Sequence, residues 1–242
     1  MRKSFMLAVG LVLLSFTAVE AQIWLEIGPK GMMGMTGLAN ANINSDPDHD
    51  SSLGFATSVG GAAVLNFGPY HGLNFEMLSA KYSHSMTYRG GDEGAETINM
   101  EWESLDVYLL YRFYRDNGAF AELGGKATYL RGAQQSRGTN WADARDNYAD
   151  QYFSGCFGVG GFVTSNKTLV VKTGLRAEYA FTDLMSDQGQ AANYPTFYTD
   201  YENYEESRPF RIGMYLEVTF GVGGLAKSQC GSRGVIFGTG YN

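Results

Sequence analysis

Three aspartates at alternate positions are the first residues whose types suggest a chemistry. Asp46, Asp48 and Asp50 resemble the start of a calcium-binding loop, in which alternate side chains supply oxygen ligands. Such a loop also needs glycine at its sixth position and glutamate at its twelfth, where this chain has Ser51 and Thr57. The pattern therefore favours a solvated acidic loop, and the sequence predicts neither a metal site nor another cofactor.

A histidine between two serines is the second candidate. His84 lies between Ser83 and Ser85, and outer-membrane lipases and acyltransferases carry histidine and serine at such positions. A serine nucleophile also needs a general base and an acid that orients that base, and no spacing here indicates one. We therefore expect no catalytic residue and no enzymatic activity.

The two cysteines give no site either. Cys156 and Cys230 are far apart in the sequence and belong to no metal-like cluster. Export would permit a disulfide between them, but the sequence leaves open whether they pair.

The remaining charged residues occur in strands that must position them. Residues 168–181 read TLVVKTGLRAEYAF, and alternate side chains of a strand point to opposite faces. One face is apolar and ends in aromatics, whereas the other carries two cations and a carboxylate. The pattern recurs along the chain without amphipathic helices to cover the apolar face. This favours a barrel with its apolar face in lipid and its charges inside.

Eight segments have this character, and two kinds of connection separate them. The connections 68–72, 115–118 and 165–167 are short, whereas 37–52, 89–96, 132–150 and 182–207 are long and polar. Outer-membrane barrels combine short periplasmic turns with longer outer loops. The alternation of apolar and polar residues slips near Ser79, where we expect a β-bulge. The predicted strands are 23–36, 53–67, 73–88, 97–114, 119–131, 151–164, 168–181 and 208–222.

The sequence therefore predicts an all-β fold, an eight-stranded antiparallel up-and-down transmembrane β-barrel spanning 22–222. An interior of this width is filled by side chains, and an unpaired charge there is costly. We expect a balanced salt-bridge lattice that plugs the lumen, with an ion path or proton relay as the alternative. The inward charges are Glu26, Lys30, Glu76, Asp106, Arg112, Glu122, Lys126, Lys172, Arg176, Glu178, Arg211 and Glu217.

The two ends of the chain indicate its compartment. Residues 1–21 have a charged start, an apolar run and a small-residue cleavage site, which is typical of a secretory signal peptide. With eight strands, both mature termini lie in the periplasm, and 223–242 form a periplasmic C-terminal tail. The formal net charge of −7 argues against nucleic acid as a partner.

The long connection 182–207 combines tyrosines with acids. Tyrosine is a low-entropy contact residue in recognition loops, so this loop is a candidate recognition surface. Alternatively, its aromatics pack on one another and cap the barrel. The aromatic residues concerned are Tyr194, Phe197, Tyr198, Tyr201 and Tyr204.

Residues 105–113 (LDVYLLYRF) and 119–124 (AFAELG) resemble the small, porin-like outer-membrane β-barrel family of Bacteroidota. That family includes PorT, the barrel component of the type IX secretion apparatus. Many members end at the aromatic of the last strand, here Phe220, whereas this chain continues for a further segment. The resemblance implies the fold and the outer membrane, with no common catalytic motif to carry over.

We therefore expect an integral outer-membrane barrel that acts by structure and binding. Its role would be that of an accessory component, for example of a secretion or assembly complex. Its partners would be the lipid bilayer and other outer-membrane or periplasmic proteins. The alternative function is a narrow gated channel for small solutes.

Overall fold

The structure is a computed structural model that describes residues 23–90, 95–138, 140–165, 169–196 and 201–222. The predicted signal peptide at 1–21, the predicted tail at 223–242, Phe197, Tyr198 and Cys230 lie outside the described residues.

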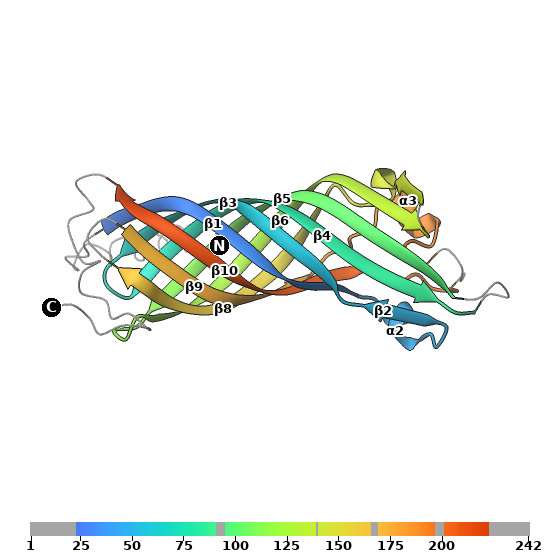
Figure 1. Ribbon diagram of the computed structural model, residues 1–242, viewed down its shortest axis with the longest axis horizontal. Coiled ribbons are helices and arrows are strands. Elements are labelled where there is room, and N and C mark those ends of the chain that lie inside the picture. Colours follow the sequence, from blue (N-terminus) through green and yellow to red (C-terminus); the bar gives the residue numbers. More distant parts are fainter. Residues whose placement is uncertain (1–22, 91–94, 139, 166–168, 197–200, 223–242) are drawn as a thin grey trace, which may run out of the picture.

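Eight long antiparallel strands close into a barrel. Each pairs with its neighbour in sequence, and β1 pairs with β10 to complete the ring. This confirms the predicted fold class (Figure 1). The ring consists of β1 (Ile23–Ala39), β3 (Gly54–Phe67), β4 (His71–Tyr88), β5 (Glu96–Tyr114), β6 (Ala119–Arg137), β8 (Gln151–Ser165), β9 (Leu169–Ala180) and β10 (Arg208–Val222).

The strands are tilted, which the register shows directly. Following paired residues once around the ring, from Leu65 on β3 through β4, β5, β6, β8, β9, β10 and β1, leads back to Phe55 on β3. The path therefore climbs by 65 − 55 = 10 residues towards the start of β3, and such a stagger accompanies strand tilt in every closed barrel. A row of paired residues therefore winds around the barrel and moves along its axis, towards the end at which β3 starts.

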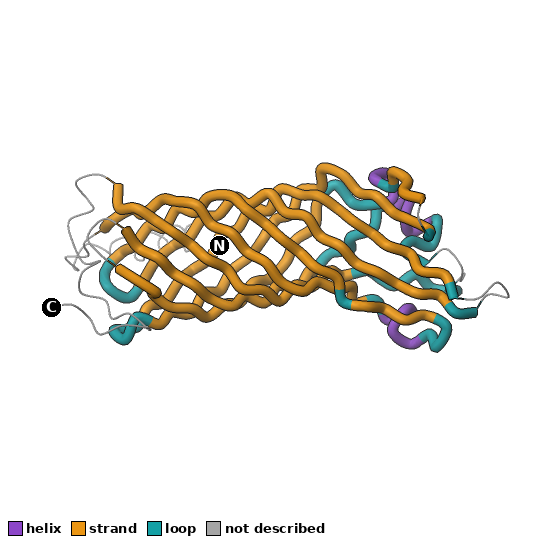
Figure 2. Tube along the Cα trace, viewed as in Figure 1, coloured by secondary structure: helices purple, strands orange, loops and turns teal. Residues whose placement is uncertain are grey.

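The two ends of the barrel differ. The start of β1 and the end of β10 lie at one end with the short turns, whereas the long connections gather at the other (Figures 1 and 2). We call these the inner and the outer end. The outer end carries β2 (His49–Ser52), β7 (Asn140–Asp143), α2 (Ala41–Ser45), α3 (Asp187–Ala191) and the 3-10 turn η2 (Arg145–Asn147).

An apolar belt surrounds the outside of the barrel. Large apolar side chains that would be buried in a soluble protein are exposed here; Leu123, Leu175 and Ile212, for example, are 64%, 57% and 59% exposed. Aromatic side chains flank the belt: Tyr111, Phe113 and Phe220 towards the inner end, and Tyr129, Phe153 and Phe181 towards the outer end. This is the surface of a lipid-facing barrel with its two aromatic girdles.

At the outer edge of the belt, the inner and outer faces exchange character. On β4 the outward residues change from Phe75 and Met77 to Ser79 and Lys81, while the inward residues become Leu78, Ala80 and Tyr82. The outward face meets water there, so it is polar, and the interior packs as an ordinary apolar core. That core includes Met86, Ile98, Met100, Trp102 and Tyr148.

This exchange explains why the predicted bulge near Ser79 is wrong. Ser79 pairs in unbroken register with Val59 on one side and Leu105 on the other. The apparent slip in the sequence marks the point where the strand leaves the belt, with no change of side-chain direction. The register shifts instead between Glu103 and Ser104 against β6, and between Phe162 and Thr164 against β9.

Two predicted outer loops contain more strand than expected. Strand β6 continues to Arg137 and then pairs with β7, so 132–150 is only partly a loop. The stretch 37–52 likewise holds the end of β1, α2 and β2, which pairs with β4. The outward side chains of these extensions are polar, so the alternation of apolar and polar residues that marks a lipid-facing strand is missing from their sequence. None of the described helices is long and apolar enough to cross a membrane.

A lysine within the belt should block insertion. Leu175→Lys places a cation on the exposed apolar face, which costs about 2 to 4 kcal/mol near the bilayer centre. Gln151→Lys, at an exposed position beside Tyr129 in the outer girdle, should insert almost normally. The measurement is the fraction of heat-modifiable, folded barrel recovered from lipid vesicles, with Leu175→Ala as a control for lost side-chain volume. Equal folded fractions for the two lysine variants would contradict the lipid-facing assignment.

Candidate functional site

The twelve charged residues expected inside all project into the lumen. Each is less than 5% exposed, and six are acids and six are bases. They come from six of the eight strands, all except β3 and β8, by the alternation that directs the apolar side chains outwards. Burial of this kind is tolerated only where charges pair, because an isolated ion loses its hydration.

Six of these side chains form a closed ring of alternating charge across the lumen, which we call the charge ring. Its acids are Glu76, Glu122 and Glu217. The consecutive contacts are Lys30–Glu76 at 2.6 Å, Glu76–Arg176 at 2.8 Å, Arg176–Glu122 at 2.6 Å, Glu122–Arg112 at 3.0 Å, Arg112–Glu217 at 2.9 Å and Glu217–Lys30 at 3.2 Å.

The arginines of the charge ring connect opposite walls. Arg112 on β5 donates two hydrogen bonds to the carboxylate of Glu217 on β10, at 3.0 and 2.9 Å. Arg176 on β9 likewise donates to both oxygens of Glu76 on β4, each at 2.8 Å. Two parallel N–H donors fit a carboxylate in fixed geometry, so each arginine fixes the distance between two walls.

A second lysine joins the charge ring to the inner end of the lumen. Lys172 contacts Glu217 at 3.0 Å and Glu26 at 2.5 Å. Glu26 also accepts hydrogen bonds from Trp24, Asn66 and Thr219. These eight charges comprise four acids and four bases, so this part of the lumen has no net charge.

Small residues on two strands provide the space that the arginines occupy. The inward positions of β3 include Ala56, Ser58, Ala62 and Val64. On β8, a Cβ atom at Gly158 would lie 2.7 Å from Oε1 of Glu122. A larger residue there would displace a member of the charge ring.

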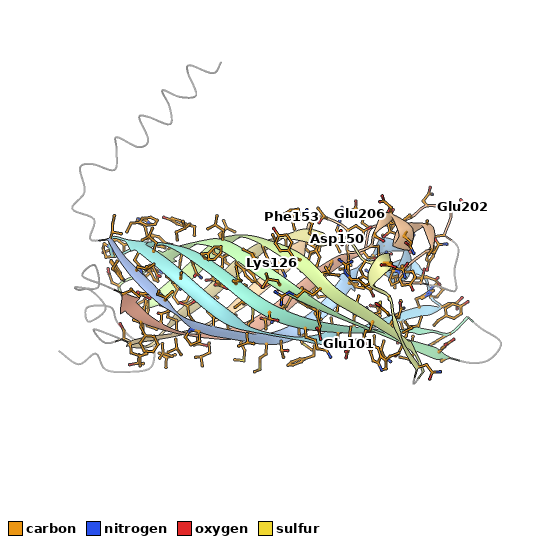
Figure 3. All side chains as sticks on the ribbon, turned by 90° about the horizontal axis from the view of Figure 1, so that it is seen from above. Glu101, Lys126, Asp150, Phe153, Glu202 and Glu206 are labelled. Atoms are coloured by element: carbon orange, nitrogen blue, oxygen red, sulfur yellow. The ribbon has the colours of Figure 1, made fainter. Side chains whose placement is uncertain are left out.

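A second polar layer lies nearer the outer end. Lys126, which lies within the outline of the barrel in Figure 3, contacts Glu178 at 2.7 Å and Asp106 at 3.7 Å. Arg211 donates to the hydroxyl of Ser58 and the carbonyl of Met32, both at 3.2 Å. Tyr82 donates a short hydrogen bond to Asp106, and Tyr108 donates to Glu178 at 3.0 Å.

Aromatic side chains close the lumen on the inner side of the charge ring. Tyr114, Phe120 and Phe162 are buried and in mutual contact, with ring centroids 5.8 to 6.2 Å apart. The guanidinium of Arg112 lies 4.7 Å from the centre of the Phe120 ring. Aromatic contacts of this kind favour a cation over the ring face and add apolar bulk to the floor of the lumen.

The long outer connections cover the other mouth, and we call them the outer cap. Tyr194 and Tyr204 pack against the apolar core of the outer end. Tyr204 donates to Asp183 at 2.6 Å, and Tyr201 donates to Asp46 at 2.7 Å. The three described tyrosines of the predicted recognition loop therefore pack in the cap. Figure 3 shows Glu202 and Glu206 at the same end.

The pKa values in the cap reflect these contacts. Burial and the hydrogen bond to Asp183 raise the pKa of Tyr204 above its ordinary value. Slight burial of Asp46 acts to raise its pKa, but hydrogen bonds from the backbone of Asp48 and from Tyr201 and His49 lower it overall. Asp46 is therefore an ionised acceptor around which part of the cap is arranged.

The aspartates at 46, 48 and 50 do not converge on one point. Asp46 bonds within the cap, whereas Asp50 forms an ion pair with Arg89 at 2.8 Å. No group of three or more histidine, cysteine, aspartate or glutamate residues within the described ranges is arranged to hold a metal ion.

The serine partner of His84 is not one of its sequence neighbours. Nε2 of His84 lies 3.2 Å from the hydroxyl of Ser51 on β2. Ser83 bonds to the backbone of Phe55, and Ser85 bonds to Asn99. Nδ1 of His84 is buried with no hydrogen-bond partner in the described part of the chain, so no acid orients the ring.

The predicted lumen network left out the polar aromatic residues. Tyr82, Tyr108 and Tyr215 are at most 2% exposed and lie against the charged groups, and the ring of Tyr215 has Nζ of Lys30 at 3.7 Å from its centre. The alternation that directs the charges inwards also directs Tyr108 and Tyr215 inwards, but the predicted network contained formal charges alone.

The charge ring should be more sensitive to imbalance than to loss of charge. Arg112→Gln or Glu122→Gln alone leaves an uncompensated buried charge, which we expect to cost about 3 to 5 kcal/mol of folding free energy. The double variant restores neutrality, so its loss should be clearly smaller than the sum of the single losses. Urea unfolding of the barrel in micelles, followed by tryptophan fluorescence, measures this coupling. Additive losses would show that the two side chains do not interact.

The comparisons with known proteins give only distant likenesses. No protein-family model matches the sequence, and no curated protein matches it. Neisserial surface protein A has TM-score 0.41 and 10% identity over 81% of this chain and 96% of that chain. The outer membrane protein OprG from Pseudomonas aeruginosa has a TM-score of 0.39 and 12% sequence identity, and the match covers 83% of this chain and 95% of that chain. The translocator domain of autotransporter NalP from Neisseria meningitidis has a TM-score of 0.35 and 10% sequence identity, and the match covers 90% of this chain and 95% of that chain. Values this low carry no argument about function, which rests on the residues of this chain.

Proposed function

We propose that this chain is an integral outer-membrane barrel with a closed lumen, which acts by structure and interaction and not by catalysis or conduction. The observation that carries the proposal is the charge ring. It joins opposite walls through contacts between Lys30, Glu76, Arg112, Glu122, Arg176 and Glu217, all buried and all paired with opposite charge.

Membrane insertion is supported by the outer surface and the closed ring of strands. In lipid, every backbone polar group needs a partner, and a closed barrel meets this requirement with strands. The apolar belt with its two aromatic girdles fits a bilayer. The short turns, the start of β1 and the end of β10 would then face the periplasm, and the export expected from 1–21 delivers the chain there.

An interaction role is supported by the outer cap. Strand β7 and its neighbours project beyond the belt, and the side chain of Trp141 on β7 is 47% exposed. An exposed tryptophan on an ordered strand is a typical contact residue in protein interfaces. The resemblance of 105–113 and 119–124 to the small Bacteroidota barrels favours an accessory place in a secretion or assembly complex.

Electrical recording tests the closed lumen. The unaltered barrel in a planar bilayer should give no steady conductance, because side chains occupy the ring, the aromatic floor and the cap. Replacing Arg112 and Arg176 together by alanine removes both arginine cross-links and should produce a measurable leak. A porin recorded in the same bilayer controls for insertion. A stable, ion-selective conductance in the unaltered barrel would favour the narrow channel instead.

Site-specific cross-linking tests the interaction role. A photoreactive phenylalanine analogue at Trp141 should give a discrete protein adduct in native membranes, whereas the same group at Leu216 in the belt should react with lipid alone. The adducts are measured by their mass on denaturing gels. Absence of any protein adduct at Trp141, or at further exposed positions of β7, would count against an accessory role.

A further inference from the structure

Two connected hollows lie on the outside of the barrel. The first has a volume of about 330 Å3, and its outward-facing side chains include Lys81, Glu103 and Arg131. The second, of about 350 Å3, is lined by Gly31, Met33 and Met214 among others. Thr57 and Ser58 line both. The two hollows are therefore parts of one groove, apolar in one half and polar in the other.

The strand register places these halves at different depths. Met214 pairs with Met33, Met33 with Thr57, Thr57 with Lys81 and Lys81 with Glu103. Rows of paired residues climb towards the outer end in this direction, as the path from Leu65 to Phe55 shows. The apolar half therefore lies within the belt, and the polar half lies at its outer edge, where the head groups of the outer leaflet would be.

A bulge presents an unpaired cation to the polar half. On β6, Leu130 pairs with Ser104 and Gly132 pairs with Glu103, so Arg131 is the extra residue. Such a residue loses its ladder partner, and its side chain is re-aimed. Arg131 is exposed, and its side chain has no hydrogen bond or ion pair within the described part of the chain.

The other charges of the groove are Lys81 and Glu103, and neither forms an ion pair with Arg131 in the described part of the chain. Nζ of Lys81 lies 2.7 Å from Glu101 on the neighbouring strand, so that lysine is already compensated. The hydroxyls of Thr57 and Ser79 line the same hollow. An arginine offers paired donors that match a phosphate group.

We propose that this groove binds a single phosphorylated lipid of the outer leaflet. Its phosphate contacts Arg131, with Lys81 and the two hydroxyls beside it, and one acyl chain lies over Gly31 and Met33 in the apolar half. The proposal rests on membrane insertion as put forward under Proposed function, and it adds a specific lipid site to that general contact.

The test uses the full barrel purified in detergent and native mass spectrometry. Dimyristoylphosphatidic acid is the probe, and dimyristoylglycerol is the same lipid without phosphate. We expect one phosphatidic acid per barrel and no retained diacylglycerol. Arg131→Gln should weaken binding by about tenfold, the effect of one lost charge-assisted hydrogen bond. Arg89→Gln is the matched control, because Arg89 is exposed at the outer end and paired with Asp50.

A second variant tests the apolar half. A Cβ atom at Gly31 would meet only the carbonyl oxygen of Ser58, at 3.9 Å, so Gly31→Leu fills the hollow without a backbone clash. It should weaken phosphatidic acid binding while Arg131 is unchanged. An excess of inorganic phosphate should compete poorly, because it lacks the acyl chain. Effective competition, with no effect of Gly31→Leu, would overturn the lipid and indicate a simple anion site.

The remaining outcomes separate this site from the proposed function. Each variant is first checked for the heat-modifiable, folded form. A folded, inserted barrel that binds phosphatidic acid equally well with Arg131→Gln overturns the lipid site and leaves membrane insertion intact. A barrel that does not insert into vesicles overturns both.

Discussion

The exclusion of water from the lumen is the constraint on which the rest of this structure depends. Charges on the inward faces lose their hydration once the barrel closes, so they need polar partners within the lumen. Most of them meet an opposite charge, whereas Arg211 donates to Ser58 and to the carbonyl of Met32. The contact of Glu217 with three cations, Lys30, Arg112 and Lys172, shows how densely this requirement is met. The small inward residues on β3 and β8 follow from the same constraint, because the arginines need their volume.

The environment outside the barrel changes along its axis, and the interior changes with it. Lipid around the middle requires apolar outward residues, and the charges collect inside. At the outer edge of the belt polar surroundings replace the lipid chains, so Lys81 and Glu101 face outwards and Trp102 and Tyr148 form a core inside. The same eight strands therefore contain two opposite solutions to burial, and the boundary between them is visible on β4 and β5.

Local alternation was sufficient to predict the fold and the inward direction of the twelve charges. It could not predict their partners, because Lys30 meets Glu76, and Arg112 meets Glu217, only after β1, β4, β5 and β10 enclose a common space. The bulge predicted near Ser79 failed for a related reason: a change of solvent resembles a change of side-chain direction in a one-dimensional pattern. The Ser51–His84 contact likewise depends on the pairing of β2 with β4.

The position of the charge ring relative to the barrel seam has a consequence for the order of folding. Lys30 lies on β1 and Glu217 on β10, the first and last strands, whose pairing closes the cylinder. The ring cannot be complete until these ends of the chain meet. Until that seam forms, the contact of Lys30 with Glu217 is missing. Completion of the charge ring and closure of the cylinder are therefore the same event.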